Sequence, residues 1–306
     1  MTHLQTLRLF TAATMIHWAC AAGSNAADKI EFIPVPGFPE VPAEVTLGKC
    51  SAVAVDSRGR VYLLHRGKTP VLCFDQTGKF LRGWGDEHHH TPHGLRIDRF
   101  DNVWTTDIGN HLVLKFNAAG KLLLALGTSG KPGTGLDQFN KPSDIAFGAG
   151  DEVYISDGYG NARVMQFNQQ GKFIRTWGKP GGAPGEFDLP HAIKVDSKQR
   201  ILVGDRENER IQVFDADAKV LAIWKGFAPY GIDIDRDGRI FVADVVAHKI
   251  LQLDEHGEIV STWGEFGTQP GQFSAPHMLA CDAEGNLYVA EVDGKRLQKF
   301  RRRTGQ

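Results

Sequence analysis

The residues best suited to chemistry are three histidines, each of which follows a proline at the start of a short apolar segment. The pairs are Pro92-His93, Pro190-His191 and Pro276-His277. Neutral imidazoles are common zinc ligands, and three protein ligands with an open fourth position are typical of a catalytic zinc site. These side chains can form such a site only if the fold brings them to one point.

Internal repetition predicts the elements that position them. Six segments share one template of four short strands separated by Gly- and Asp-containing turns, and several close on Trp-Gly. Repeats of about 40 to 50 residues with four strands each are typical of propeller blades. The sequence therefore predicts an all-β, six-bladed β-propeller. The last repeat lacks its fourth strand, so we expect the N-terminal strand at 28–34 to complete that blade and close the ring.

The segments 205–214 and 107–111 resemble the NHL repeat, a known propeller blade. Alignment of the six repeats gives one residue in each that starts the innermost strand and borders the central channel. We call this the slot position, and its occupants are Ser51, His93, Ser143, His191, Tyr230 and His277. The histidines alternate around the ring, so we predict a triangle of imidazoles that holds zinc. The alternative is that the Pro-His pair was inherited from an ancestral blade without a metal role.

A second register places Arg66 and Arg206 in the turn after the second strand, in blades one and four. Two guanidiniums that face a metal would suit a substrate with a carboxylate. Tyr159 reaches the same rim, and a metal cation can lower the pKa of a phenol so that it acts as a base. The alternatives are a surface ion pair, since Glu207 adjoins Arg206, and an exposed turn aromatic for Tyr159.

Composition limits the function classes. The 306 residues carry a formal net charge of -1 and are 42% hydrophobic. No basic field favours nucleic acid, and no apolar segment is long enough to span a membrane. We expect a monomer with one propeller domain at 27–306.

The N-terminal residues 1–26 are predicted to be a signal peptide, because an apolar stretch leads into Ser24-Asn25-Ala26-Ala27. Cleavage after Ala26 would give a secreted or periplasmic protein. The mature chain would keep Cys50, Cys73 and Cys281, which allow one disulfide of open pairing.

A family resemblance covers most of the mature chain, from about Lys49 to Phe300. The motifs that carry it occur in one order: 65–67, 92–95, 156–159 with Asn161 and Arg163, 190–191, 205–208 with 210–212, and 276–277. Together they resemble the catalytic core of the peptidyl-α-hydroxyglycine α-amidating lyases.

The resemblance implies a zinc ion held by His93, His191 and His277. It also implies that Tyr159 is the base and that Arg66 and Arg206 contact the substrate. The implied reaction cleaves the C–N bond of a C-terminal α-hydroxyglycine and releases a peptide amide and glyoxylate.

The sequence departs from the family pattern at two places. The family's structural calcium binds two backbone carbonyls, which correspond to Val53 and Leu95, and an Asp directly after the third histidine. Met278 stands at that place, so we expect calcium to bind weakly. Gly160 replaces a family cysteine after the tyrosine, so the family's disulfides are not expected. Since the 306 residues include no monooxygenase segment, a related α-hydroxyamide is a second substrate candidate.

Two other functions are consistent with a propeller. The first is a non-catalytic NHL-repeat protein that binds a protein or glycan through its loops. The second is a lactonase-type hydrolase, which is less favoured because such enzymes use inward carboxylates on calcium and the slots hold Ser, His and Tyr.

Overall fold

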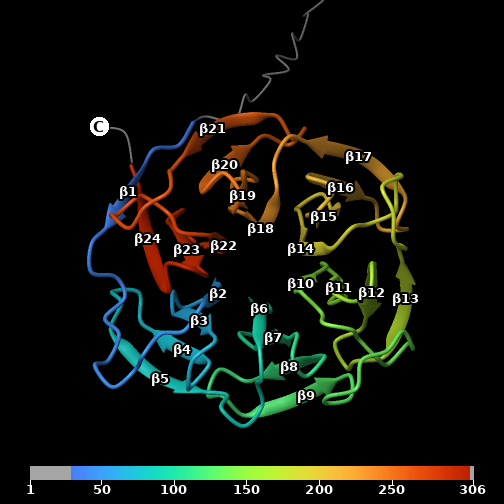
Figure 1. Cartoon of the computed structure of the whole chain (residues 1–306), viewed down its shortest axis with the longest axis horizontal. Coiled ribbons are helices and arrows are strands. Elements are labelled where there is room, and N and C mark those ends of the chain that lie inside the picture. Colours follow the sequence, from blue (N-terminus) through green and yellow to red (C-terminus); the bar gives the residue numbers. More distant parts are fainter. Residues whose placement is uncertain (1–28, 304–306) are drawn as a thin grey trace, which may run out of the picture.

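The computed structural model describes residues 29–303, and within them the chain contains 24 strands and no helix. The strands form six four-stranded antiparallel sheets that surround one axis (Figure 1). The predicted six-bladed β-propeller is therefore confirmed.

Five blades are each formed by four consecutive strands. Blade 1 contains β2 (Cys50–Val55), β3 (Val61–His65), β4 (Val71–Phe74) and β5 (Phe80–Trp84). Blade 2 contains β6 (Pro92–Ile97), β7 (Val103–Asp107), β8 (Leu112–Phe116) and β9 (Leu122–Leu126). Blade 3 contains β10 (Asp144–Phe147), β11 (Val153–Asp157), β12 (Arg163–Phe167) and β13 (Phe173–Trp177). Blade 4 contains β14 (Pro190–Val195), β15 (Ile201–Asp205), β16 (Arg210–Phe214) and β17 (Val220–Lys225). Blade 5 contains β18 (Pro229–Ile234), β19 (Ile240–Asp244), β20 (Lys249–Leu253) and β21 (Ile259–Trp263).

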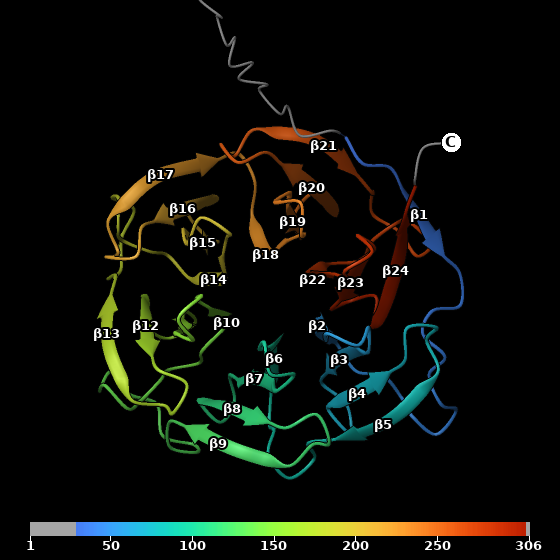
Figure 2. The same cartoon turned by 180° about the vertical axis from the view of Figure 1, so that it is seen from behind.

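Blade 6 joins the two ends of the chain. It contains β22 (Pro276–Cys281), β23 (Leu287–Glu291), β24 (Arg296–Arg302) and, as its outer strand, β1 (Phe32–Val35). Strand β1 pairs antiparallel with β24, as Figure 2 shows from behind. The expected closure by the N-terminal strand is confirmed, with a strand at 32–35 that overlaps the predicted segment 28–34 and ends one residue beyond it.

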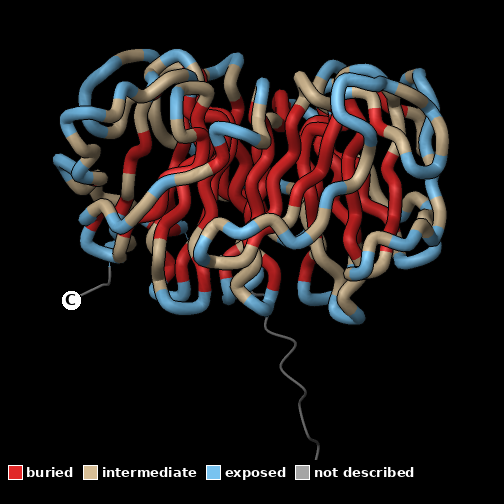
Figure 3. The backbone as a smooth tube through the Cα atoms, turned by 90° about the horizontal axis from the view of Figure 1, so that it is seen from below, coloured by how far each residue is buried: buried red, intermediate tan, exposed pale blue. Residues whose placement is uncertain are grey.

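Burial follows the distance of a strand from the axis. The three inner strands of each blade are almost entirely buried, whereas outer strands such as β5 alternate between partly buried and exposed residues. Figure 3 shows the buried strands between two faces of exposed loops. Apolar side chains fill the space between neighbouring blades, as where Tyr62 and Leu64 of blade 1 pack with Leu114 and Phe116 of blade 2. Each such side chain contributes about 1.5–3 kcal/mol of burial free energy.

The turn after the innermost strand carries a structural aspartate in five blades. Its Oδ1 accepts the backbone N–H groups of the residues two and four positions later, which holds the turn closed. The five residues are Asp56, Asp98, Asp196, Asp235 and Asp282.

The remaining predictions about the chain concern its cysteines and its ends. Cys50, Cys73 and Cys281 are all free thiols, so the disulfide that their number allowed is not formed. Among the described residues, no helix could cross a membrane. The predicted signal peptide at 1–26 lies outside the described residues.

Candidate metal centre

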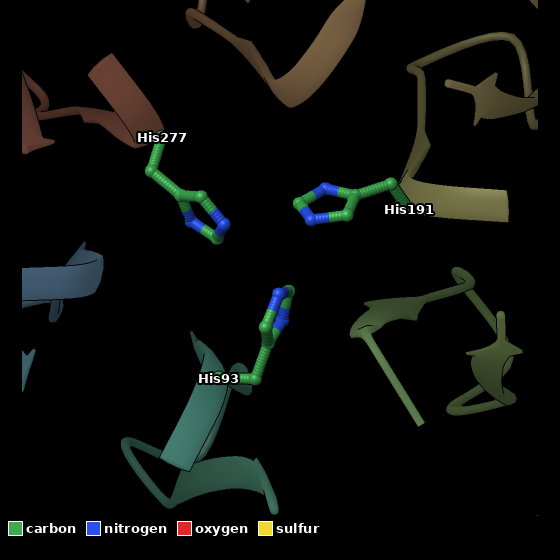
Figure 4. A group of neighbouring side chains, drawn as sticks. All are labelled: His93, His191 and His277. Carbon is green, nitrogen blue, oxygen red and sulfur yellow. The ribbon is translucent and has the colours of Figure 1, made fainter. Parts of the chain in front are cut away.

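The three slot histidines meet at the axis of the propeller. Figure 4 shows the imidazoles of His93, His191 and His277 turned toward one another from β6, β14 and β22. Their ring centroids are 4.7, 4.8 and 4.9 Å apart, and their candidate ligand atoms lie within 4.8 Å of one another. The predicted triangle is therefore present in the structure, and its three buried histidines could bind a metal ion.

A backbone irregularity at each slot aims these side chains at the axis. The pairing register with the second strand shifts between Pro92 and Leu95, between Pro190 and Ala192, and between Pro276 and Leu279. Each shift encloses the histidine. A β-bulge bends its strand locally and redirects a side chain. Each Pro-His pair therefore lies at an irregularity of its innermost strand, as do the slot residues Ser51 and Tyr230.

The three slots without histidine fix the orientation of the imidazoles. Nδ1 of His93 lies 2.7 Å from the carbonyl oxygen of Ser143, and Nδ1 of His191 lies 2.6 Å from that of Tyr230. Nδ1 of His277 lies 2.6 Å from the carbonyl oxygen of Ser51. A carbonyl only accepts, so each Nδ1 carries the proton and each Nε2 keeps a lone pair. Metal-bound histidines commonly donate their other ring N–H to a carbonyl in this way.

The electrostatics keep the three imidazoles neutral. Burial lowers the pKa of His277 to about 3, and the nearby Arg66 and Arg206 guanidiniums act in the same direction. Burial also holds the pKa of His93 and of His191 well below the ordinary value, with neighbouring imidazoles adding to the effect. A metal ligand must be the neutral form of histidine, so the trio is ready to coordinate at neutral pH.

Tyr159 lies between two of the histidines. Its Oη is 3.0 Å from Nε2 of His93 and 3.0 Å from Nε2 of His191. The sequence predicted that a cation would lower the pKa of this phenol. Burial raises the pKa of Tyr159, whereas the Arg206 and Arg66 guanidiniums lower it. The expected aromatic at the rim is thus part of the histidine cluster, and its ionisation depends on the positive charge around it.

Arg66 and Arg206 lie on either side of this cluster. Arg66 is partly buried, and its Nε donates to the carbonyl oxygen of Pro92 at 3.1 Å. Among the described residues it has no ion-pair partner. Arg206 Nη1 donates to Tyr159 Oη at 3.3 Å, and its Nε donates to Glu207 at 2.7 Å. Arg206 therefore forms both the predicted alternative, an ion pair with Glu207, and a hydrogen bond to Tyr159 in the cluster.

Tyr230 is a site residue that sequence reasoning named only as a slot. The guanidinium carbon of Arg206 lies 4.6 Å from the Tyr230 ring centroid and 5.3 Å from that of Tyr159. The Tyr230 ring also contacts His191 at 4.9 Å. An aromatic residue in a slot was the available signal, because its neighbours in the ring are two histidine slots.

The position at which the resemblance implies a calcium-binding carboxylate, Met278, does not fit calcium. Val53, Leu95 and Met278 are fully buried. Met278 and Leu95 belong to the apolar cluster that also contains Ala52. A calcium ion takes six to eight oxygen ligands, and a thioether in an apolar cluster is not among them.

A cleft borders Tyr159, and none of the three histidines lines it. It has a volume of about 570 Å³ and is lined by Thr134, the turn at 158–163 and the segments 178–181 and 187–189. Pockets of this size hold small organic ligands. The cleft therefore links the tyrosine at the metal centre to the loops between blades 3 and 4.

Comparison with known proteins finds relatives among NHL-repeat proteins and amidating lyases. Residues 138–222 match a family model described as a 6-bladed beta-propeller. NHL repeat-containing protein 3 of Mus musculus is 34% identical over 287 residues, which cover 86% of this chain and 82% of the relative. Peptidyl-alpha-hydroxyglycine alpha-amidating lyase 1 of Drosophila melanogaster is 30% identical over 311 residues, which cover 84% of this chain and 57% of that protein.

A solved streptogramin B lyase superposes with a TM-score of 0.63 at 15% identity, covering 90% of this chain and 98% of that structure. At that identity the similarity shows the fold alone. The two sequence relatives carry the assignment further. The chain belongs to the NHL-repeat β-propeller family that includes NHL repeat-containing protein 3 and the peptidyl-α-hydroxyglycine α-amidating lyases.

Proposed function

We propose that the protein is a zinc-dependent carbon–nitrogen lyase that cleaves a C-terminal α-hydroxyglycine, or a related α-hydroxyamide, into an amide and glyoxylate. The observation that carries the proposal is the convergence of three Nε2 lone pairs, on imidazoles that are each fixed by an Nδ1 hydrogen bond to a carbonyl. The similarity to an amidating lyase of Drosophila melanogaster supports the same reaction.

His93, His191 and His277 would hold the metal. Three neutral nitrogen ligands with an open position match the preference of zinc, and carboxylate-poor surroundings disfavour magnesium or calcium. When bound, zinc would supply Lewis acidity to the substrate's hydroxyl oxygen and favour loss of its proton.

Arg66 and Arg206 would bind the carboxylate that leaves in glyoxylate. Arg66 has no ion-pair partner among the described residues, and Arg206 keeps Nη1 directed at the cluster while Glu207 takes its Nε. Guanidinium groups bind carboxylates in two-pronged geometry. This pair would fix the substrate's terminal end beside the imidazoles.

Tyr159 would move the proton. As a phenolate, it would accept the proton of the substrate hydroxyl while the C–O bond becomes a carbonyl and the C–N bond breaks. The electron pair of that bond leaves with the nitrogen, which takes the proton back from Tyr159 and becomes the amide. The atoms balance without water, as a lyase reaction requires. Burial holds the pKa of Tyr159 above its ordinary value, and the positive charge of Arg206 and Arg66 only reduces this rise, so the phenolate would depend on the bound metal.

The first experiment measures metal content and glyoxylate release. Purified protein should contain one equivalent of zinc and should release glyoxylate from α-hydroxyhippurate. A His93→Ala, His191→Ala, His277→Ala triple variant should do neither. Equal and negligible zinc in both proteins would overturn the metal assignment. Stoichiometric zinc without glyoxylate release would overturn the substrate assignment only.

A non-catalytic binding propeller is the second candidate. It is favoured by the 34% identity to NHL repeat-containing protein 3, whose name states no reaction. It predicts that substitutions of Arg66, Tyr159 and Arg206 leave zinc content, stability and partner capture unchanged. A lactonase-type hydrolase has less support, because Asp144 and Asp233 in the channel are paired with basic side chains.

Secretion and a monomeric state belong to the same proposal. Amino-terminal sequencing of the exported product should find residue 27 first, and the protein should elute at the mass of one chain.

A further inference from the structure

The channel holds a second polar cluster a few residues along the innermost strands from the histidines. Arg96 lies three positions after His93 in β6 and is 5% exposed. Its partners Asp144 and Asp233 are 0% and 4% exposed. Charged groups buried to this degree are stable only when paired and hydrogen-bonded.

The Arg96 guanidinium is surrounded by oxygen atoms from three other blades. Its Nε and Nη2 donate to the two carboxylate oxygens of Asp144 at 3.0 and 2.7 Å. Nη2 also donates to the carbonyl oxygen of Ile232 at 3.1 Å, and Nη1 donates to that of Leu279 at 3.5 Å. Asp233 Oδ1 lies 3.9 Å from Nη1. Five oxygens from β10, β18 and β22 therefore face one cation.

The two carboxylates are themselves anchored to the remaining strands. Asp144 Oδ2 accepts the backbone N–H of Ile193 in β14 at 3.1 Å. Asp233 Oδ2 accepts the backbone N–H of Cys281 in β22 at 2.7 Å, and its Oδ1 pairs with Lys194. Two basic and two acidic side chains balance in charge. One network thus ties the innermost strands of blades 2 to 6.

The position of Asp144 links this network to the missing calcium ligand. Asp144 follows the slot residue Ser143 as Met278 follows the slot residue His277. The channel therefore has a carboxylate at this register position, in blade 3 instead of blade 6. Carboxylates and main-chain carbonyls are the ligands that calcium prefers, and here they bind a guanidinium.

We propose that Arg96 is a built-in cation that occupies an oxygen cage in the channel and cross-links the blades, so that this propeller needs no structural calcium. A guanidinium donates five N–H groups in a fixed plane, which lets one side chain bridge carboxylates and carbonyls from several strands. The proposal is independent of the proposed reaction, because none of these residues belongs to the histidine cluster.

The test compares melting temperature and calcium content in the full-length, zinc-loaded wild type and in two variants, Arg96→Met and Arg96→Lys. After dialysis against calcium-free buffer, the wild type should contain no calcium, and millimolar calcium chloride should leave its Tm unchanged. Removing one partner of a buried ion pair is strongly destabilising, so Arg96→Met should lower the Tm by roughly 10 °C. Arg96→Lys keeps the charge and should lose less.

Added calcium should raise the Tm of Arg96→Met, because the substitution leaves two carboxylates and two carbonyls around a space with no guanidinium. Lys194→Met is the matched control, since it removes a basic group at the edge of the cage and leaves its centre filled. Stoichiometric calcium in the wild type, or a wild-type Tm that rises with calcium, would overturn the proposal even if Arg96→Met does not fold. An Arg96→Met variant as stable as the wild type would also overturn it.

Discussion

The two polar clusters in the channel differ in how completely their groups are paired. At the Arg96 cluster, each basic side chain has a carboxylate partner, and each carboxylate also accepts a backbone N–H. At the histidine cluster, three Nε2 lone pairs converge on one point, and the guanidinium of Arg66 has no ion-pair partner among the described residues. Ion-paired groups stabilise a fold, whereas acceptors that converge on one point beside a guanidinium with no carboxylate partner are the mark of a binding site.

The comparison also shows that the strand scaffold does not decide the role. Both clusters project from innermost strands and share β6 and β14, in which Arg96 follows His93 and Lys194 follows His191 after three positions. The side-chain set decides it. Neutral imidazoles whose Nδ1 protons are already donated need an electrophile at Nε2, whereas an arginine with two carboxylates needs nothing more.

The largest change in rate is expected for Tyr159→Phe, which tests whether the histidine cluster, and not the Arg96 cluster, is the functional one. The variant removes the hydroxyl that lies 3.0 Å from two histidine Nε2 atoms and keeps the ring. Loss of a general base costs about 100- to 10,000-fold in rate, so kcat for glyoxylate release should fall by that factor. Zinc content should not change, because the three ligands remain. Measured zinc loss together with the rate loss would show that Tyr159 serves the metal site and not the proton transfer.

A smaller effect is expected for Arg206→Met. A hydrogen bond to a charged group contributes about 1.5–3 kcal/mol, so kcat/KM for α-hydroxyhippurate should fall roughly 10- to 100-fold, mainly through KM. Lys194→Met is the control from the paired cluster and should leave kcat/KM unchanged while it lowers the Tm slightly. If the two variants change kcat/KM equally, the functional division between the clusters is wrong.

Alignment of the repeats was sufficient to predict the fold and the meeting of the histidines. Strand period, turn residues and the slot register together predict that His93, His191 and His277 lie on one axis, as they do in the structure (Figure 4). The slot register depends only on side-chain alternation and repeat length, and both can be read from the amino-acid sequence.

The environment of those histidines could not be predicted in the same way. The acceptors that fix each Nδ1 are main-chain carbonyls, and a carbonyl has no signature in the sequence. Arg96 and Asp144 are 48 residues apart, and their pairing depends on how neighbouring blades face each other. The burial of Tyr159 by the surrounding blades, which raises its pKa, was likewise not visible in the turn motif.

The smallest expected effect on KM is that of substituting Tyr230. It tests whether the contact between the Tyr230 ring and the Arg206 guanidinium contributes to the histidine cluster. The Tyr230 ring lies 4.6 Å from the guanidinium carbon of Arg206, which also contacts Tyr159 at 5.3 Å. A cation–π contact is worth about 0.5–2 kcal/mol, so Tyr230→Ala should raise KM for α-hydroxyhippurate by about 3- to 30-fold and leave zinc content unchanged. Tyr230→Phe keeps the ring and should restore KM to within about twofold of the wild type. A variant pair in which Phe behaves like Ala would show that the hydroxyl acts directly, which would make Tyr230 a substrate contact and not a support for Arg206. The carbonyl that Tyr230 offers to His191 belongs to the backbone, so neither variant removes it, and an unchanged zinc content separates the two roles of this slot.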